Sequence, residues 1–303
     1  MQVLIVGTVA FDAIETPYGK TDKIIGGAAT YIGLSASALL EETHLVSVVG
    51  DDFPQETINL MTKKGMDVEG LQIRKGEKTF FWSGKYHRDM NTRDTLDTQL
   101  NVLSNFDPIV PEKSKNADVL MLGNLMPSVQ QRVLDQMNQR PKLVVLDTMN
   151  FWMDNFLDDL TTALKSVDVL TINDEEARQL SGEYSLVKAA QKIMKMGPSY
   201  LIIKKGEHGA MLFNRDNIYF APAFPLADVL DPTGAGDSFA GGFVSYLAHH
   251  GEISWPAMKR AVAHATVMAS FCVEKFGIER LLEITPAEME ERKLALAELT
   301  RMG

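Results

Sequence analysis

The amino-acid sequence predicts an α/β protein in which a mostly parallel β-sheet lies between layers of helices. Two observations support this prediction. Short apolar runs of strand-like length recur along the first two thirds of the 303-residue chain, and most are separated by segments with apolar residues at spacings of three and four. This alternation is typical of a sheet whose two faces are both covered by helices.

The predicted strands are runs rich in Val, Ile and Leu. They cover Val3 to Val9, His44 to Val49, Val119 to Gly123, Leu143 to Asp147, Val169 to Ile172 and Tyr200 to Lys204. A hairpin is predicted after them, at residues 209–214 and 217–221. Because ligands of such sheets bind at the carboxyl ends of the strands, we expect functional side chains to follow these runs.

The predicted helices show the complementary spacing of apolar residues. They cover Ala28 to Leu40, Gln55 to Lys64, Ser128 to Asn138, Asp174 to Leu180, Leu186 to Lys195, Asp237 to His250, Trp255 to Phe271 and Pro286 to Arg301. Within the sixth of these, Phe239, Phe243, Tyr246 and Leu247 share one face. We interpret that face as core packing.

One region breaks the alternation of strands and helices. Residues 79–103 contain aromatic and β-branched residues in strand-like order, without a strong helical pattern. Together with residues 12–25 they could form a small sheet that closes over a substrate as a lid, or they could be an insertion without a function. No internal repeat, low-complexity tract or linker divides the chain, so residues 1–303 are expected to form one core that carries this lid.

Composition and charge exclude several classes of protein. Forty acidic and thirty basic residues give a formal charge of -10, which disfavours nucleic acid and anionic membranes as partners. The single cysteine, Cys272, lies in an apolar run, which indicates a buried thiol in a protein of the reducing cytoplasm. The apolar start VLIVGTVAF is too short for a membrane span and is expected to be the first strand.

The most informative segment is DPTGAGDSFAGGF at residues 231–243, where a glycine-rich turn enters a predicted helix. The glycines allow backbone N–H groups to converge on an anion, and the helix dipole adds positive charge there. Asp237 would then lie beside a bound phosphate, where its carboxylate could accept a proton from a hydroxyl group. The pattern therefore indicates a kinase, although small residues and an acid can also simply begin a helix. The glycine pair at 241 and 242 indicates close backbone packing inside the helix.

With this signature, the chain resembles the PfkB, or ribokinase-like, carbohydrate kinases along its whole length. Residues 24–39, IIGGAATYIGLSASAL, are similar to the N-terminal signature of that family. NDEEARQL at 173–180 and KKGEHGA at 204–210 resemble its Asn-x-x-Glu element and its nucleotide loop. The resemblance implies a ribokinase-like three-layer α/β/α sandwich with a small β-sheet lid. It also implies transfer of the γ-phosphoryl group of ATP, with Mg²⁺, to a sugar, a nucleoside or a related alcohol. It leaves activation by K⁺ open, and it makes a homodimer formed through the lid plausible.

The resemblance also assigns residues on the nucleotide side. Asp237 matches the catalytic base, and Gly234, Ala235 and Gly236 match the anion hole. Asn173 and the metal-site residue Glu176 match residues that order magnesium-bound water and phosphates. Residues near the nucleotide are matched by Lys204, Gly206 and His264. Taken alone, Asn173 and Glu176 also fit a capped helix start, and His264 has the apolar neighbours of a core residue.

On the acceptor side, the resemblance places Asp12 where sugar hydroxyls bind, with Gly26 and Gly27 allowing close approach of the backbone. Tyr31 departs from the asparagine of many sugar kinases in the family, which makes ribose itself less favoured. Tyr31 could contact the acceptor through its ring, so a nucleoside or cyclitol stays open. Aromatic side chains of the lid, Phe81, Trp82 and Tyr86, could do the same or could pack only against one another.

A second departure follows the strand that ends at Asp147. The segment LDTMNFW at 146–152 lacks an arginine that family members use for acidic groups. Arg88 and Arg93 in the lid segment could replace it, or could simply be solvated.

Other classes are less well supported. The chain has no GxxxxGK[ST] motif and no GxGxxG motif after its first strand, which disfavours P-loop ATPases and Rossmann dehydrogenases. A non-catalytic sensor for nucleotide or sugar is the remaining alternative, and the intact GAGD segment with Asp237 favours an enzyme instead.

Overall fold

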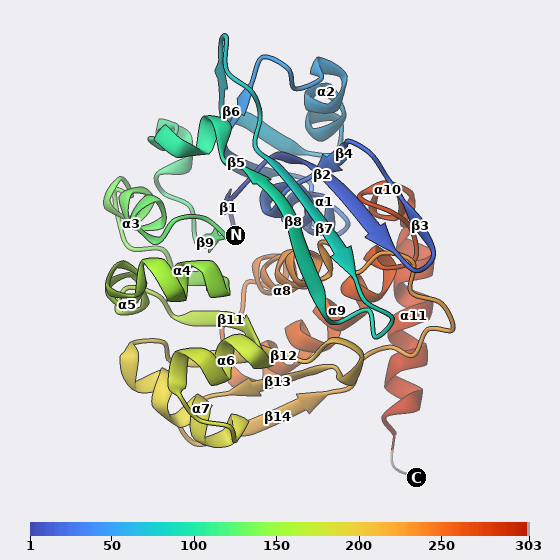
Figure 1. Cartoon of the computed structure of the whole chain (residues 1–303). Coiled ribbons are helices and arrows are strands. Elements are labelled where there is room, and N and C mark those ends of the chain that lie inside the picture. The colour runs from blue at the N-terminus through green and yellow to red at the C-terminus, as the bar shows by residue number, and fades with distance from the viewer. Residues whose placement is uncertain (302–303) are drawn as a thin grey trace.

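A computed structural model describes residues 1–301 and contains a nine-stranded central sheet (Figure 1). The strand order is β14-β13-β12-β11-β10-β9-β1-β5-β6. The strands are β1 (Val3–Val6), β5 (Thr43–Gly50), β6 (Met66–Arg74), β9 (Val119–Leu122), β10 (Leu143–Asp147), β11 (Val169–Asn173), β12 (Tyr200–Lys204), β13 (Ala210–Phe213) and β14 (Ile218–Ala221). The run from β6 to β12 is parallel throughout, and the β13–β14 hairpin adds antiparallel pairings at one edge.

Helices cover both faces of this sheet, so the fold is a three-layer sandwich. One layer contains α1 (Ala28–Ala36), α2 (Gln55–Lys63), α8 (Ala235–His250), α9 (Trp255–Cys272), α10 (Glu279–Glu283) and α11 (Pro286–Leu299). The other contains α3 (Pro127–Asp135), α4 (Asn150–Asn155), α5 (Leu157–Leu164), α6 (Asp174–Ser181) and α7 (Leu186–Ile193). Successive strand residues alternate between the two cores: Ile5 packs in the first and Leu4 in the second. The predicted α/β class is confirmed.

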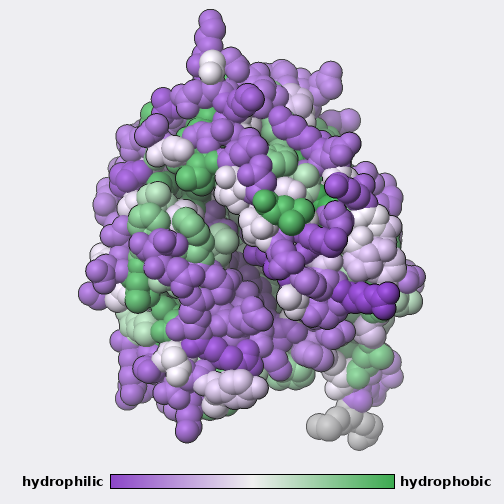
Figure 2. Space-filling model, viewed as in Figure 1, coloured by the Kyte–Doolittle hydropathy of each residue, from purple (hydrophilic) through white to green (hydrophobic). Residues whose placement is uncertain are grey.

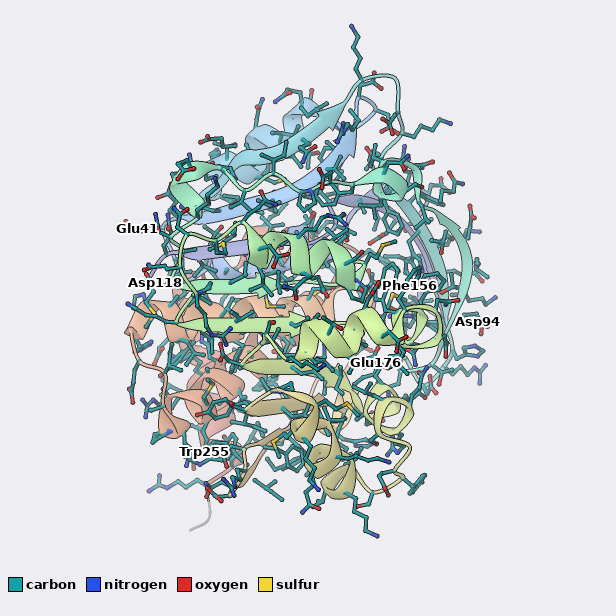
Figure 3. All side chains as sticks on the ribbon, turned by 90° about the vertical axis from the view of Figure 1, so that its left-hand side faces the viewer. Glu41, Asp94, Asp118, Phe156, Glu176 and Trp255 are labelled. Carbon is teal, nitrogen blue, oxygen red and sulfur yellow. The ribbon has the colours of Figure 1, made fainter. Side chains whose placement is uncertain are left out.

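A second, smaller sheet lies apart from this sandwich. It is built from β2 (Ala10–Thr16), β3 (Gly19–Lys20), β4 (Ile24–Gly26), β7 (Phe81–Tyr86) and β8 (Arg93–Gln99). Its order is β3-β2-β7-β8, with β4 also paired to β2. Figure 3 shows this sheet at the same edge of the molecule as Glu176, which follows the carboxyl end of β11. The small sheet therefore stands over the edge where ligands are expected.

Several elements were not predicted from the sequence, among them β6, α4, α5 and α10. Strand β6 lies at the edge of the central sheet and buries only Met66 and Gly70, so it lacks the apolar run that marks the inner strands. Helices α4 and α5 are short and are separated at Phe156, which leaves too few turns for a clear periodic pattern. Short 3-10 helices connect other elements at Asn101–Asn105, Glu112–Ser114, Met194–Met196 and Gly206–His208.

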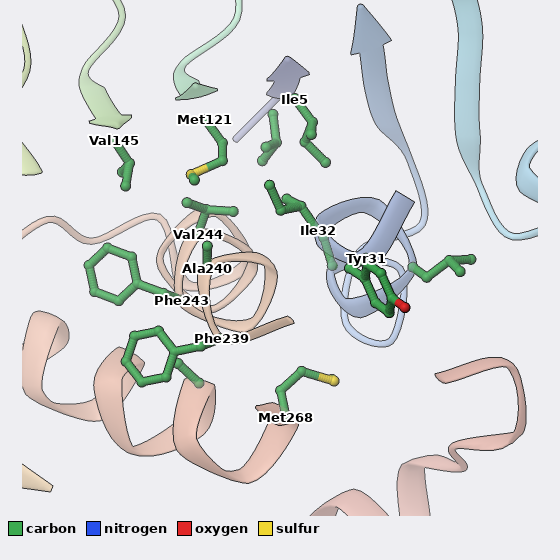
Figure 4. Packing of buried hydrophobic residues seen from close by; sticks show 14 of the residues in the cluster. Ile5, Tyr31, Ile32, Met121, Val145, Phe239, Ala240, Phe243, Val244 and Met268 are labelled. Carbon is green, nitrogen blue, oxygen red and sulfur yellow. The ribbon is translucent and has the colours of Figure 1, made fainter. Parts of the chain in front are cut away.

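Helix α8 packs at the centre of its layer, between the sheet and its neighbours α1 and α9 (Figure 4). A Cβ atom at Gly241 would overlap the carbonyl oxygen of Ile32, and one at Gly242 would lie 2.9 Å from Met268 Cβ. The close packing predicted for this glycine pair is confirmed. The face that carries Phe239 and Phe243 is buried, as expected for core residues.

The remaining fold-level expectations concern Cys272 and membranes. The thiol of Cys272 is free and fully buried, as the surrounding apolar run predicts. Among the helices formed by residues 1–301, none combines the length and the apolar character that crossing a bilayer requires.

Candidate active site

The glycine-rich turn before α8 is shaped by the buried side chain of Asp231. Its carboxylate accepts hydrogen bonds from the backbone N–H of Thr233, at 2.9 Å, and from that of Gly277, at 2.8 Å. Gly234 then caps the helix with φ at 76°, a conformation that glycine adopts readily. Asp231 therefore fixes the path of the turn and ties it to the segment after α9.

The turn leaves several backbone donors free at the start of α8. The N–H of Ala235 donates to the carbonyl of Pro232 at 3.2 Å. Within residues 1–301, the N–H groups of Gly234, Gly236 and Asp237 donate no backbone hydrogen bond to the preceding turn. The free donors thus differ from the predicted set, because Asp237 replaces Ala235. Three free N–H groups at a helix N-terminus suit an anion.

The carboxyl group of Asp237 lies in the first turn of the same helix. Burial and the nearby charge of Asp147 raise its pKa to about 7, against the opposing charges of Lys204 and Arg93. A carboxyl group with this pKa exchanges a proton readily near neutral pH.

Lys204 connects two strand ends beside this turn. Its ammonium group lies 2.7 Å from Asp147 Oδ2, and the hydroxyl of Thr171 donates to the same oxygen at 2.9 Å. Burial opposes the charge on Lys204, but Asp147 and Glu176 outweigh it and raise the pKa of the ammonium group. A Cβ atom at Gly236 would lie 3.1 Å from Lys204 Nζ, so the cation sits close to the glycine turn.

Asn173 and Glu176 form a reciprocal capping box at the start of α6. The Asn173 side chain accepts from the N–H of Glu176 at 2.7 Å, and the Glu176 carboxylate accepts from the N–H of Asn173 at 2.8 Å. Burial raises the pKa of Glu176 to about 7, with Lys204 opposing the shift. The capped helix start weighed as an alternative is thus present, and it leaves the second oxygen of a buried carboxylate available.

The donor set suits magnesium held together with phosphates rather than a free metal ion. Residues 1–301 contain no cluster of three or more His, Cys, Asp or Glu side chains that could hold a metal. Magnesium in phosphoryl-transfer sites is usually held by one or two carboxylates, substrate phosphates and water. Glu176 supplies a carboxylate of this kind, so the residues fit a magnesium–nucleotide complex.

Asp12 lies on β2 with only 5% of its surface exposed. Burial and the charge of Asp231 raise its pKa to about 7, and a hydrogen bond from the backbone of Gly27 opposes the shift. A Cβ atom at Gly26 would overlap the Asp12 carboxylate, and Gly27 has φ at 94° as the cap of α1. Both glycines are therefore needed to seat Asp12 against the start of α1.

The structure places Tyr31 differently from the sequence-based expectation. Its ring is 1% exposed, and a Cβ atom at Gly234 would overlap it. Its hydroxyl group has no hydrogen-bond partner among the described residues. The ring therefore supports the glycine turn from behind, and a direct contact with an acceptor does not fit this burial.

His264 lies in a separate cavity of about 340 Å³ between β14, α8, α9 and α11. The imidazole is 4% exposed and contacts Tyr246, with ring centroids 5.5 Å apart. Neither ring nitrogen has a partner within residues 1–301. Burial and the charge of Lys293 lower its pKa to about 4, so the ring is neutral and can donate or accept a hydrogen bond.

The small sheet contacts two loops that flank the site. The Tyr86 hydroxyl lies 3.3 Å from Thr233 Oγ1, immediately before the glycine turn. The turn between β7 and β8 reaches Gly206, where a Cβ atom would overlap the side-chain amide of Asn91. Figure 2 shows the surface hollowed in the middle of this view, with mostly hydrophilic walls.

Sequence reasoning selected neither Asp147 nor Asp231 as a site residue. Asp147 is the last residue of β10, so an acid at the carboxyl end of a predicted strand was the available signal. Asp231 is the first residue of the glycine-rich segment itself.

An α/β sandwich in which a glycine-rich helix start, a buried lysine and a carboxyl group meet is typical of phosphotransferases that act on an alcohol group. The chain belongs to the pfkB family of carbohydrate kinases, and the family model matches residues 2–284. It is 28% identical over 251 residues to a cytidine kinase of Thermococcus kodakarensis, covering 81% of this chain and 88% of the relative. It is 27% identical to a nucleoside kinase of Methanothermobacter thermautotrophicus, with 91% of both chains covered.

Solved structures agree on the fold. A nucleoside kinase of Methanocaldococcus jannaschii, described as an archaeal member of the ribokinase family, superimposes with a TM-score of 0.78 at 21% identity, covering 97% of this chain and 99% of that one. An E. coli protein described as a putative ribokinase II, in complex with ATP and Mg²⁺, gives a TM-score of 0.77 at 18% identity, covering 97% and 99%. The ribokinase-like fold predicted from the sequence is confirmed.

Proposed function

We propose that this chain transfers the γ-phosphoryl group of ATP to a hydroxyl group of a sugar-containing acceptor, with a nucleoside as the favoured class. The observation that carries the proposal is the position of Asp237. Its carboxyl group, with a pKa near 7, lies in the same helical turn as N–H groups that have no backbone partner. A base and an anion cradle in one turn suit attack by a hydroxyl on a phosphoryl group.

The proposed reaction follows from these positions. Asp12 accepts hydrogen bonds from acceptor hydroxyl groups and orients one of them toward the phosphate. Asp237 takes the proton of that hydroxyl as its oxygen bonds to the γ-phosphorus, and the bond from phosphorus to the bridging oxygen of ADP breaks. The free N–H groups stabilise charge on the phosphoryl group in transit. Glu176 would help to hold Mg²⁺, which neutralises charge on the phosphate oxygens when bound.

The cavity around His264 is the proposed site for the adenine ring. Helix α8 begins at the anion cradle, and Tyr246 on the same helix lines the cavity. The axial rise from Asp237 to Tyr246 is about 14 Å, comparable with the length of an extended nucleoside triphosphate. The unpartnered nitrogens of His264 could bond to a base edge, and Tyr219 and Tyr246 supply aromatic surface.

A nucleoside is favoured as acceptor because both relatives named above by activity, each less than 30% identical, are kinases of nucleosides. Sugars without a base and cyclitols remain alternatives, since Asp12 recognises hydroxyl groups in any of them. The small sheet would act as the lid, because Tyr86 and Asn91 reach both loops beside the nucleotide.

Three further parts of the proposal concern surroundings and assembly. The outer edge of β8 is exposed over its whole length and includes Leu96, which supports pairing of two lids in a homodimer. Light scattering would detect that dimer. Activation by K⁺ is tested by comparing turnover in KCl and in NaCl. A cytoplasmic location is supported by the single buried thiol and is tested by cell fractionation.

The deciding experiment incubates the protein with ATP, Mg²⁺ and a panel of nucleosides, sugars and cyclitols, and follows ADP release. We expect turnover that depends on a nucleoside. The Asp237→Asn variant should still bind ATP while its turnover falls about 1000-fold. Ligand-induced thermal stabilisation without ADP release would instead indicate a sensor, and near-normal turnover by the variant would remove Asp237 from the mechanism.

A further inference from the structure

The small sheet carries one arginine on the face that turns toward the active site. In the β7–β8 pairing, Arg93 lies directly opposite Tyr86, so the two side chains share a face of the sheet. Tyr86 is 5% exposed, and its hydroxyl lies 3.3 Å from Thr233 Oγ1. Arg93 is therefore held next to Tyr86, which in turn contacts the residue that precedes the glycine turn.

The turn that connects these strands is fixed by its own hydrogen bonds. The Asp89 carboxylate accepts from the hydroxyl of Thr92 at 2.6 Å and from the N–H of Asn91 at 3.1 Å. The Asn91 side chain in turn lies against Gly206 in the loop after β12. The hairpin thus spans from the anion cradle to the nucleotide loop, and Arg93 lies two residues after Asn91, at the register position of Tyr86.

The guanidinium group is not committed to a structural ion pair. Arg93 takes part in none of the ion pairs among residues 1–301, whereas its neighbour Asp94 pairs with His87 at 2.9 Å. The guanidinium carbon lies 5.6 Å from the ring centroid of Trp82. Strand β8 is exposed along its length, so an arginine there without a carboxylate partner suits a ligand that brings its own negative charge.

The charges in the cleft indicate where that ligand lies. Burial raises the pKa of Asp12, Glu176 and Asp237, and the charge of Arg93 opposes the shift in all three. Arg93 therefore acts on the base, on the metal-side carboxylate and on the acceptor-side carboxylate at once. The γ-phosphoryl group, during its transfer, is the ligand group that would lie among these three side chains.

We propose that Arg93 contacts the phosphoryl group during its transfer and is a catalytic residue supplied by the small sheet. This inference rests on the proposed kinase function. The guanidinium group undergoes no covalent change: the acceptor oxygen bonds to phosphorus, ADP leaves, and the proton goes to Asp237. Arg93 donates hydrogen bonds to the equatorial oxygens, whose charge increases as the bond to ADP breaks.

The test compares Arg93→Gln with Arg88→Gln, a matched control in the turn of the same hairpin, outside the β7–β8 pairing. Calorimetry measures the affinity for Mg·ADP and for Mg·AMP-PCP, a non-hydrolysable analogue that carries the γ-phosphate, so no acceptor is needed. We expect Arg93→Gln to weaken binding of the analogue about tenfold without changing ADP binding. Arg93→Lys should lose less, and Arg88→Gln should match the parent protein.

A kinetic comparison completes the test, with the nucleoside that the panel identifies. Arg93→Gln should lower kcat on the order of 100-fold at an unchanged KM for the acceptor and an unchanged melting temperature. Equal losses for both nucleotides, no loss for either, or a rise in acceptor KM alone would overturn the assignment; the last result would place Arg93 on the acceptor. If the parent protein binds neither nucleotide, the proposed function fails, and this inference fails with it.

Discussion

The ammonium group of Lys204 lies 2.7 Å from Asp147 Oδ2, across the ends of two strands that are separated only by β11. Burial is the main cause of the raised pKa of Asp237, and the charge of Asp147 is the second. The charge of Lys204 opposes the shift. The two members of this ion pair therefore tune the proposed base in opposite directions.

This pair predicts how turnover depends on pH. Protonated Asp237 cannot accept a proton, so kcat/KM should fall as the pH drops below about 7. In Asp147→Asn the pKa of Asp237 should decrease, and the acidic limb should move about one unit lower. The measurement is the pH profile of kcat/KM. Asp154→Asn, an exposed change on α4, serves as control, and an acidic limb that stays near 7 in Asp147→Asn would contradict the assignment.

The raised pKa of Asp237 also predicts a gain in stability when its charge is removed. A carboxyl group whose pKa is higher in the folded than in the unfolded state destabilises the fold as the pH rises from about 4 to about 7. At pH 8 the free energy of unfolding of Asp237→Asn should therefore exceed that of the parent by about 2 kcal/mol. This value is smaller than the full pKa shift implies, because solvent in the cleft screens the charge. The difference should vanish below about pH 4. Equal stability of the two proteins at pH 8 would contradict the raised pKa of Asp237.

Gly26 predicts a selective effect on the acceptor. A Cβ atom there would overlap the Asp12 carboxylate, so Gly26→Ala should displace Asp12 and raise the acceptor KM about tenfold or more. The KM for ATP should not change, because Gly26 and Asp12 are assigned to the acceptor side. Steady-state kinetics with each substrate varied in turn would test this. A change in the KM for ATP alone would contradict the assignment of Asp12 to the acceptor.

Tyr31 predicts that the ring matters and its hydroxyl does not. The hydroxyl is buried without a partner, so Tyr31→Phe should leave both KM values unchanged and should not lower the melting temperature. Tyr31→Ala should lose about 3 to 5 kcal/mol of stability, because the ring fills the space behind Gly234. Thermal and denaturant unfolding report the difference. A raised acceptor KM in Tyr31→Phe would restore the direct contact that the sequence suggested.

The central sheet was predictable because its inner strands are buried on both faces and therefore appear as continuous apolar runs. Strand β6 escaped prediction for the same reason, since as an edge strand it buries little. The glycine-rich turn before α8 was predictable because its residues are contiguous, from Gly234 to Asp237, and its use as an anion cradle is part of the proposed function. The position of Tyr31 was not, because it depends on contact between α1 and the turn before α8, which are about two hundred residues apart in the chain.

The same reasoning explains the cationic residues. Lys204 was assigned from a local loop pattern, but its partner Asp147 comes from another strand, and only the strand order brings the two together. Arg93 was one of two lid arginines that the sequence could not separate. The β7–β8 register distinguishes them, because it pairs Arg93 with the buried Tyr86.

Helix α8 meets α1 and α9 through Gly241 and Gly242, where its backbone lies against the Ile32 carbonyl and against Met268 with no room for a Cβ atom. Such a contact cannot be adjusted by exchanging one side chain for another. The sequence around the proposed nucleotide site should therefore tolerate few substitutions. Apart from the proposed role of Arg93, the outer strand β8 of the small sheet has no comparable constraint, because its residues are exposed. New acceptor preferences in descendants of this chain should therefore arise through substitutions in that sheet, with the machinery for ATP inherited unchanged.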